Sequence, residues 1–416
     1  MKHKFLGYRC SLCGEEYLHE EVIYVCPQDG GNLDIIYDFD ALKKTLSIES
    51  LLTSREESIW RYLALLPLGT GLEEPTAITH VGWTPIYSPA RLKQVFDVSD
   101  FWVKDESCNP TASFKDRASA VVVSRAKEIK ADVVVTASTG NAGAALAGMA
   151  AAADHKAVIF APRSAPPAKI AQLLIYNATV LLVDGSYDQA FDLSIDAAEE
   201  FGWYCRNTGY NPFTLEGKKT AALEIWEQLL YPGSLKDPLH IFVSVGDGNI
   251  ISGLHKGFKD LLELGWLEMM PRIYGVQSEG SAAVANTFLA GDENIIPVSA
   301  NTRADSISVD LPRDGVRAVR AARQTGGKYI TVSDEEIMTA IPELGQVGVF
   351  AEPAGAAAYA GYKKALIQSI VNHDAPALVL NTGSGLKDVN AAMASVKPAP
   401  VIEPTLRAIE KALNKI

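Results

Sequence analysis

Residues 132–148 read DVVVTASTGNAGAALAG, and this stretch decides the fold class. The run DVVV is rich in β-branched residues and predicts a buried strand, whereas the alanine-rich run after the turn predicts a packed helix. A strand followed by a glycine-bearing turn recurs in LHIFVSVGDGNIISGLHKGF (239–258) and in PALVLNTGSGLKD (376–388). Strands separated by segments of helix length are typical of βαβ units and parallel sheets. The sequence therefore predicts an α/β fold of two open twisted sheets flanked by helices.

These three turns are the first candidates for a binding site. Each combines glycine with serine, threonine or asparagine, so that backbone N–H groups and a helix N-terminus can point at one spot, which suits an anion. Open α/β sheets bind their ligands at the carboxyl ends of strands, where these turns lie. The turn GDGNIISG lacks the Lys-Ser/Thr pair of a P-loop and does not match the dinucleotide fingerprint, so a nucleotide is not favoured.

The bulk composition excludes several classes of protein. Of the 416 residues, 48% are hydrophobic and 21% are charged, close to the globular average. The net charge of −12 argues against a general binder of nucleic acid or of anionic membranes, because such binders need clustered Lys and Arg. The longest apolar tract is alanine-rich and broken by charges, which predicts a packed helix and a strand rather than a membrane span. No secretory signal is visible, and the odd number of cysteines, five, favours the reducing cytoplasm.

The first 40 residues differ from the rest of the chain. They carry Cys10 and Cys13 in CSLCG and Cys26 in CPQDG, with Asp29 where a fourth cysteine would complete the pattern. Paired Cys-x-x-Cys turns on two hairpins form a zinc ribbon, because tetrahedral zinc needs four ligands from two tight turns. Residues 1–40 are therefore predicted as a zinc-ribbon-like β module with the three cysteines as metal ligands, to which Asp29 could add an oxygen ligand. The alternative is a hairpin module that keeps only relics of a metal site, with PQDGG as an ordinary turn.

A single lysine, Lys115, lies within NPTASFKDRASA (109–120). A lysine that is held near an anion pocket can condense with an aldehyde, because burial lowers its pKa enough for it to react. The alternative is a surface cation that pairs with Asp116 or Glu106.

Several motifs resemble those of one family of pyridoxal-phosphate enzymes. KDESCNPTASFKDRASA resembles the lysine motif Asn-Pro-(Thr/Ser)-Gly-Ser-Phe-Lys-Asp-Arg-Gly of the fold shared by tryptophan synthase β, cysteine synthase and the threonine/serine dehydratases, with Ala112 and Ala118 in place of its two glycines. STGNAGAALA is similar to the Ser-(Ser/Thr)-Gly-Asn loop of that family. LNTGSGLKD, NPFTLEGKKTAALEI and VFAEPAGAAAYAG resemble the threonine synthases most, although Ser384 stands where their motif usually has histidine. The resemblance covers nearly the whole chain and implies a fold type II pyridoxal-phosphate enzyme.

The resemblance implies a cofactor site. Lys115 would form the imine with the aldehyde of pyridoxal 5'-phosphate and would then move protons, and Phe114 would lie beside the ring. Asn141 would hydrogen-bond the phenolic oxygen of the cofactor. Thr382 would face the pyridine nitrogen, where a neutral hydroxyl leaves that nitrogen largely unprotonated. Backbone N–H groups of one loop would hold the phosphate: Gly246, Asp247, Gly248, Asn249 and Ile250.

The resemblance also implies a substrate site. The residues that would hold the substrate carboxylate are Ser138, Thr139, Gly140, Asn141 and Ala142. A second anion pocket must take a substrate phosphate, and the segment DGSYDQAFDLS offers Gly185 and Ser186 but lacks the arginine that several members carry. Further candidates for this pocket are Lys104, Arg163, Lys169 and Asn211. Lys104 and Lys169 could equally be solvated charges.

The implied activity is that of a threonine synthase, a carbon–oxygen lyase that converts O-phosphohomoserine and water into threonine and phosphate. The departures from the family pattern leave an alternative, which is a related β/γ-replacement enzyme, a threonine/serine dehydratase or an ammonia-lyase. A non-catalytic scaffold protein is a third hypothesis, from another class. We expect a small amino-acid substrate, no nucleic-acid or membrane partner, a homodimer and a cytoplasmic location.

The same reasoning predicts the domain boundaries. Residues 41–75 read as polar helices and are predicted to form a helical arm that packs on the main body. By the resemblance, residues 76–115 and 217–416 form a large cofactor-binding domain, and residues 116–216 form a small α/β domain.

Overall fold

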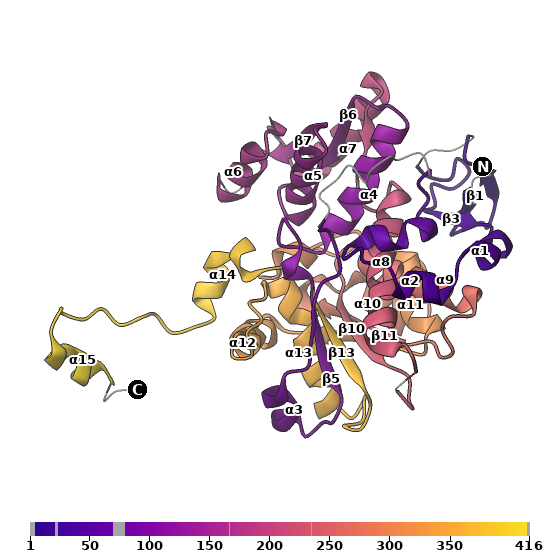
Figure 1. Cartoon of the computed structure of the whole chain (residues 1–416). Helices are drawn as coiled ribbons and strands as arrows, with labels where there is room; N and C mark the ends of the chain where they lie inside the picture. The colour runs from indigo at the N-terminus through magenta and orange to yellow at the C-terminus, as the bar shows by residue number, and fades with distance from the viewer. Residues whose placement is uncertain (1–4, 21–23, 70–79, 166, 234, 414–416) are drawn as a thin grey trace.

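The strands of the chain form three separate sheets in the computed structural model, which describes residues 5–20, 24–69, 80–165, 167–233 and 235–413. A six-stranded and a four-stranded sheet are each flanked by helices, and a small three-stranded sheet lies near the N-terminus (Figure 1). The predicted α/β class, with two open sheets and an N-terminal β module, is confirmed.

The N-terminal sheet is antiparallel, with the strand order β2-β1-β3. Its strands are β1 (Phe5–Cys10), β2 (Glu16–Leu18) and β3 (Leu33–Tyr37). The side chains of Tyr8, Leu33 and Ile35 are buried and join the hydrophobic core of the main body. The module is therefore packed on the rest of the molecule rather than tethered to it.

The segment after the module forms three short helices, α1 (Phe39–Thr45), α2 (Ile48–Leu52) and η1 (Ile59–Leu65). Ile59 and Trp60 are buried in the same core, which agrees with an arm packed on the body. Residues 70–75 of the predicted arm lie outside the described residues.

The six-stranded sheet has the order β12-β11-β10-β13-β5-β4 and is parallel except for β4, which pairs antiparallel with β5. Every residue of β10 and β13 is buried, as expected for central parallel strands that are covered on both faces. The strands are β4 (Ile86–Tyr87), β5 (Phe101–Asp105), β10 (His240–Ser244), β11 (Arg272–Ser278), β12 (Tyr329–Val332) and β13 (Ala377–Asn381).

The four-stranded sheet is parallel, with the order β8-β7-β6-β9. Its strands are β6 (Val133–Ala137), β7 (Lys156–Pro162), β8 (Thr179–Val183) and β9 (Tyr204–Cys205). All four lie within residues 116–216, and all six strands of the other sheet lie outside that range. The domain boundaries themselves stay a prediction.

Helices cover both large sheets. With β6 and β7, Figure 1 shows α5, α6 and α7 gathered in its upper part, and it shows α8 to α13 around β10, β11 and β13 below them. The helices of the main body are α3 (Ala90–Phe96), η2 (Glu106–Cys108), α4 (Lys115–Glu128), α5 (Asn141–Ala152), α6 (Pro167–Ile175), α7 (Tyr187–Phe201), α8 (Phe213–Ile225), η3 (Trp226–Leu230), α9 (Asn249–Leu264), η4 (Glu279–Ser281), α10 (Ala283–Leu289), η5 (Asp305–Ile307), α11 (Gly315–Gln324), α12 (Asp334–Gly345), α13 (Pro353–Ile367) and η6 (Gly385–Lys387). Beyond them, α14 (Val389–Ala394) is followed by an extended segment that leaves the body and ends in α15 (Leu406–Leu413) (Figure 1).

Candidate active site

Lys115 is the first residue of α4, at the end of a loop that is held from two sides. On one side, the backbone N–H of Thr111 donates to the Asp116 carboxylate over 2.6 Å. On the other side, the loop pairs with the segment after β13: the Phe114 N–H donates to the Thr382 carbonyl over 2.9 Å. The lysine is therefore fixed at the carboxyl end of β13, where an open α/β sheet binds its ligand.

The two alanines of the lysine motif meet different surroundings. Ala112 has φ +64°, in the left-handed region that favours glycine. Ala118 is fully buried on α4 and faces Gly217 of α8, where an added Cβ would lie 2.7 Å from the Ala118 Cα atom. The extra methyl group of Ala118 is thus accommodated by a glycine on the facing helix, whereas Ala112 keeps its backbone strain.

The surroundings of Lys115 suit an amine that reacts. Burial lowers its pKa to about 8, an effect that the Glu352 carboxylate opposes and the Arg206 guanidinium strengthens. The surface-pair interpretation of Lys115 is wrong for both of its predicted partners. Asp116 is bonded to Thr111 instead, and the Glu106 carboxylate is bonded to Arg117, 2.7 Å from its Nε atom.

Asn141 and Glu352 face each other beside this lysine. The Asn141 Nδ2 atom, at the start of α5, donates to Glu352 Oε1 over 2.8 Å and to Ser306 Oγ over 3.4 Å. Burial raises the pKa of the Glu352 carboxyl group, and the charge of Lys115 opposes that shift. A Cβ atom at Gly383 would lie 2.4 Å from Glu352 Oε1, so this glycine lets the carboxylate approach the loop that carries Thr382. The sequence analysis predicts no role for Glu352 or Ser306. The sequence indicates only that Glu352 precedes Pro353 in VFAEPAG, a pair that is typical of a helix start.

The loop after β10 forms a cradle at the N-terminus of α9. Gly248 has φ +93°, and a Cβ atom there would lie 2.6 Å from the Asp314 carbonyl oxygen. Asp247 accepts hydrogen bonds from the backbone N–H groups of Arg313 and Asp314, over 2.7 and 2.9 Å. The Asn249 side chain donates to Asp314 Oδ2 over 2.7 Å. Hydrogen bonds to residues 313 and 314 therefore fix the position of the predicted phosphate loop, Gly246 to Ile250.

Positive charge is concentrated next to this cradle. The Lys218 Nζ atom donates to the side-chain oxygen of Asn249 over 2.6 Å. Burial holds the pKa of Lys218 well below its usual value, and the nearby charges of Lys115 and Arg206 lower it further. A bound dianion would relieve that repulsion, so a helix N-terminus, backbone N–H groups and buried cations together fit a phosphate-bearing aldehyde.

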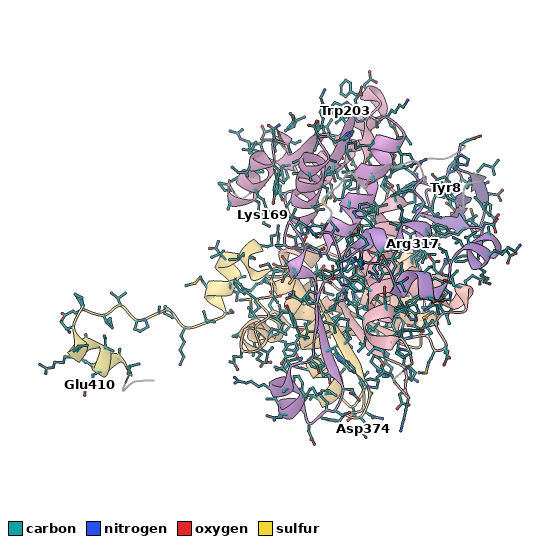
Figure 2. The ribbon with its side chains drawn as sticks, viewed as in Figure 1. Tyr8, Lys169, Trp203, Arg317, Asp374 and Glu410 are labelled. Carbon is teal, nitrogen blue, oxygen red and sulfur yellow. The ribbon has the colours of Figure 1, made fainter. Side chains whose placement is uncertain are left out.

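A cavity of about 100 Å³ opens beside Asn141 and Glu352. Two contacts cross it: Lys169 of α6 pairs with Asp305, and Lys387 donates to Gln172 over 3.1 Å. Figure 2 shows Lys169 on the side of the molecule from which the C-terminal segment leaves. The described residues that line the cavity are Thr139, Gly140, Asn141, Ala168, Lys169, Gln172, Asp305, Ser306, Glu352, Pro353, Ala354, Leu386, Lys387 and Asp388.

Some of the residues predicted to bind the substrate lie at this cavity and others do not. Thr139 and Gly140 line it, whereas their neighbours Ser138 and Ala142 are not among the described lining residues. Ser186 lies elsewhere: it caps α7, where its Oγ atom accepts from the Gln189 N–H over 3.2 Å. Its prediction as a substrate ligand gains no support from this position.

Of the further candidates for the phosphate pocket, Lys169 lines the cavity and the other three do not. Lys104 is fully buried and pairs with Glu224, its Nζ atom 2.9 Å from Oε2. Arg163 is exposed, 3.9 Å from Asp184. Asn211 donates to the backbone carbonyl of residue 205 over 2.7 Å and shapes the turn before α8. Lys387, which the sequence analysis does not single out, is the second cation among the described residues that line the cavity.

The comparisons with known proteins agree with this geometry. The profile of the family described as "Pyridoxal-phosphate dependent enzyme" matches residues 77–383. The threonine synthase of Methanocaldococcus jannaschii is 36% identical over 411 residues, which cover 98% of this chain and 99% of that protein. The chain belongs to the pyridoxal-phosphate dependent enzymes and, within them, to the threonine synthase family.

Other members and neighbours of the family extend the match. The threonine synthase of Methanosarcina acetivorans is 35% identical over 408 residues, 97% of this chain and 98% of that protein. The solved structure of threonine deaminase isoform 2 from Solanum lycopersicum has a TM-score of 0.64 at 24% identity, with 78% of this chain and 84% of that chain covered, and it shows the shared fold. The predicted cofactor, pyridoxal phosphate, is confirmed by the family.

Two further predictions concern other parts of the molecule. The three predicted metal ligands, Cys10, Cys13 and Cys26, lie together with Asp29 in the N-terminal module. None of the described helices is both long enough and apolar enough to cross a membrane.

Proposed function

We propose that the chain is a threonine synthase that converts O-phosphohomoserine and water into threonine and phosphate. The observation that carries this proposal is the pair of lysines, Lys169 and Lys387, in the cavity beside the predicted cofactor site. A substrate that bears a carboxylate at one end and a phosphate at the other needs positive charge in that place. The near-full-length identity with threonine synthases supports the same substrate.

The residues of the chain have separate tasks in this proposal. The Lys115 amine, with its lowered pKa, would hold the cofactor by its aldehyde and would move protons at the substrate carbons. The buried Phe114 would lie beside the ring, and the Asn141 amide, which here donates to Glu352, would hydrogen-bond the phenolic oxygen. The hydroxyl group of Thr382 would face the ring nitrogen, and the loop Gly246 to Ile250 would hold the phosphate. When bound, pyridoxal phosphate withdraws electrons from the bonds that break at the substrate α carbon.

The substrate is held by two anion sites. Backbone N–H groups of Thr139 to Ala142, at the N-terminus of α5, would face the carboxylate, whereas the Ser138 N–H already donates to the Phe160 carbonyl. Lys169 and Lys387 offer two ammonium groups to the phosphate. Burial lowers the pKa of Lys387, an effect that the charges of Asp116 and Glu352 oppose, so a bound dianion would favour its charged form.

Product analysis with the purified holoenzyme tests this activity. We expect threonine and inorganic phosphate in equal amounts from O-phosphohomoserine. Formation of 2-oxobutyrate from threonine, without phosphate release from O-phosphohomoserine, would favour a dehydratase instead. Lys169→Met and Lys387→Met should each raise KM for O-phosphohomoserine at least tenfold, whereas Lys363→Met, which breaks a surface pair with Glu343, should leave KM unchanged.

We also propose that the enzyme is a cytoplasmic homodimer. All five cysteines are free, as in a reducing compartment. The C-terminal segment exposes apolar side chains, with Leu406 84% and Leu413 62% exposed, and a second copy of the chain would cover them. Light scattering on the full chain should give the mass of a dimer, and Leu406→Glu with Leu413→Glu should weaken it. A monomeric mass for the unsubstituted protein would contradict the proposal.

A further inference from the structure

Two similar turns of the N-terminal module bring four side chains together. The turn Cys10–Gly14 closes with a hydrogen bond from the Gly14 N–H to the Cys10 carbonyl, 3.1 Å, and the turn Cys26–Gly30 closes in the same way over 2.9 Å. Both closing glycines have positive φ, +79° and +69°. Each turn thus presents its first and fourth side chain to the same point, and Asp29 occupies in the second turn the position that Cys13 has in the first.

The distances between these side chains fit one tetrahedral zinc ion. The Cys13 and Cys26 Sγ atoms are 3.8 Å apart, and Cys10 Sγ lies 3.3 Å from Asp29 Oδ1. Zn–S bonds of about 2.3 Å and a Zn–O bond of about 2.0 Å in tetrahedral geometry place two sulfurs about 3.8 Å apart and sulfur and oxygen about 3.5 Å apart. All four ligand atoms lie within 4.8 Å of one another.

The surroundings of the cluster also favour a metal. The Leu12 N–H donates to Cys10 Sγ over 3.3 Å, a contact that stabilises a thiolate. The Gly31 N–H donates to Asp29 Oδ1 over 2.8 Å and orients the carboxylate. A Cβ atom at Gly31 would lie 2.6 Å from Cys10 Sγ, so this glycine allows the two turns to close on each other.

We propose that the module binds one structural zinc ion through Cys10, Cys13, Cys26 and Asp29, and that this ion helps to hold the cradle of the cofactor phosphate in place. Four protein ligands leave no open position, which is the arrangement of structural rather than catalytic zinc. The second part of the proposal rests on the proposed function, because it assigns the loop Gly246 to Ile250 to the phosphate.

Helix α11 connects the zinc cluster to that cradle. Arg320 donates to the carbonyl of Ser11, which lies between the two ligands of the first turn. Arg317 donates over 2.7 Å to Asp34 on the strand that follows the second turn, and its Nε atom lies 2.5 Å from Asp314 Oδ1. The other oxygen of Asp314 accepts from Asn249 in the cradle.

The central residues of this path, Arg317, Asp314 and Asn249, are buried. Figure 2 shows Arg317 in the half of the molecule that carries the N-terminal module, which Tyr8 marks. Loss of the metal would make the two turns more mobile and would weaken the contacts of Arg320 with Ser11 and of Arg317 with Asp34. Asp314, which is bonded to Arg317, would then be fixed less firmly. Asp314 also supplies the backbone contact behind Gly248, so the loop would then bind phosphate less tightly.

Metal analysis of the untagged, purified protein tests the site without regard to activity. We expect about one zinc per chain, retained on gel filtration, and cobalt(II) substitution should give the visible bands of a tetrahedral thiolate site. Cys13→Ser should lose most of the zinc, Asp29→Cys should bind it more tightly, and Cys108→Ser, an exposed cysteine outside the cluster, should keep it. If Cys13→Ser does not fold, removal of zinc from the parent protein by a chelator replaces it. Protein that contains no metal after expression with added zinc, or a Cys13–Cys26 disulfide, would overturn the proposal.

The link to the cradle has its own measurement. Pyridoxal phosphate is titrated into apoenzyme with and without zinc, and its Kd should rise at least tenfold when zinc is removed. Arg317→Met should raise Kd similarly while the zinc content stays at one per chain. An unchanged Kd in zinc-free protein would refute the link and leave the metal site standing, and normal zinc content without any threonine formation would refute the proposed function alone.

Discussion

Replacing Gly248 with alanine should weaken the binding of pyridoxal phosphate, and a second glycine on the same helix supplies the control. Gly248 precedes α9 with φ +93°, and Gly265 follows α9 with φ +76°. A Cβ atom at Gly248 would lie 2.6 Å from the Asp314 carbonyl oxygen and 2.9 Å from the Ala318 Cβ atom. At Gly265, no atom of the described residues would come within 4 Å of it.

The two substitutions share one cost and differ in another. A left-handed conformation costs a residue with a Cβ atom about 1–2 kcal/mol, and this applies at both ends of the helix. Forcing atoms into a packed contact adds about 1–3 kcal/mol, and this applies at Gly248 alone. The atoms behind Gly248 belong to backbone and to a buried helix, so the loop must move away from them, toward the space of the phosphate. Since 1.4 kcal/mol is a factor of ten, Kd for the cofactor should rise about 5- to 150-fold.

Absorbance titration of the two apoenzymes with pyridoxal phosphate measures this difference. Thermal unfolding of both apoenzymes should show the shared backbone cost, and only Gly248→Ala should show the loss of affinity. A Gly248→Ala protein with the parental Kd would mean that the loop does not approach the phosphate, and the assignment of residues 246–250 would fail. An equal loss in Gly265→Ala would assign the effect to the stability of α9 instead.

Three further perturbations follow from the described contacts. Ala112→Gly should relieve the strain at φ +64° and raise the free energy of unfolding by up to about 1 kcal/mol, measured by chemical denaturation; a lower stability would contradict it. The rate at which Lys115 captures the cofactor aldehyde should rise with pH to a plateau with a midpoint near 8, the lowered pKa of its amine. Because the unfolded chain binds more protons than the native apoenzyme between pH 8 and 10.5, the free energy of unfolding of the apoenzyme should also rise over that interval. A midpoint of the capture rate well above pH 8, or a gain in stability that begins only at higher pH, would refute the burial of the amine. Glu224→Gln should destabilise the fold by about 3–5 kcal/mol because two buried cations lose their carboxylate, whereas Glu16→Gln at an exposed pair should cost less than about 1 kcal/mol in the same assay.

The elements that the sequence predicts are those with long buried patterns. The apolar runs in DVVVTAS and LHIFVSVG, for example, are strands β6 of the four-stranded sheet and β10 of the six-stranded sheet. The strands β4, β9 and β12 have two to four residues, too few for a periodic signal, and they were not singled out. These strands pair because the neighbouring strand offers them hydrogen bonds, which is a property of the tertiary structure rather than of the local sequence.

In the site too, some residues can be predicted from the local sequence and others are placed only by tertiary structure. The glycine-bearing turns and Lys115 are predictable because each lies at the end of a strand, and parallel strands end at one edge of a sheet. Glu352 is not predictable in this way: its partner Asn141 is 211 residues away, and only packing brings the two together. The sequence predicts Lys104 as a phosphate ligand or as a solvated charge, but the residue forms a buried pair with Glu224. Its role is decided by a partner on α8, far from strand β5 along the chain.

Two adjacent lysines of α8 show how the fold separates structural charge from functional charge. Lys218 and Lys219 are both fully buried. The ammonium group of Lys219 lies 2.6 Å from the Glu216 carboxylate and 2.7 Å from that of Asp260, so the protein itself neutralises it. Lys218 instead donates to the neutral amide oxygen of Asn249, and its pKa is depressed by burial and by neighbouring positive charges.

A buried cation that lacks a bonded carboxylate is costly, and a fold keeps one where a ligand supplies the missing charge. Lys218 donates to Asn249 in the loop that we assign to the cofactor phosphate, and the charges of Lys115 and Arg206 lower its pKa further. The Arg206 guanidinium also lowers the pKa of Lys115. The arrival of a phosphate dianion would therefore act on both lysines: it would stabilise the charge of Lys218 beside the cradle and raise the proton affinity of Lys115. In the empty site, the lowered pKa leaves the Lys115 amine neutral enough to capture the aldehyde. Once the phosphate is bound, the same amine would be basic enough to accept a substrate proton.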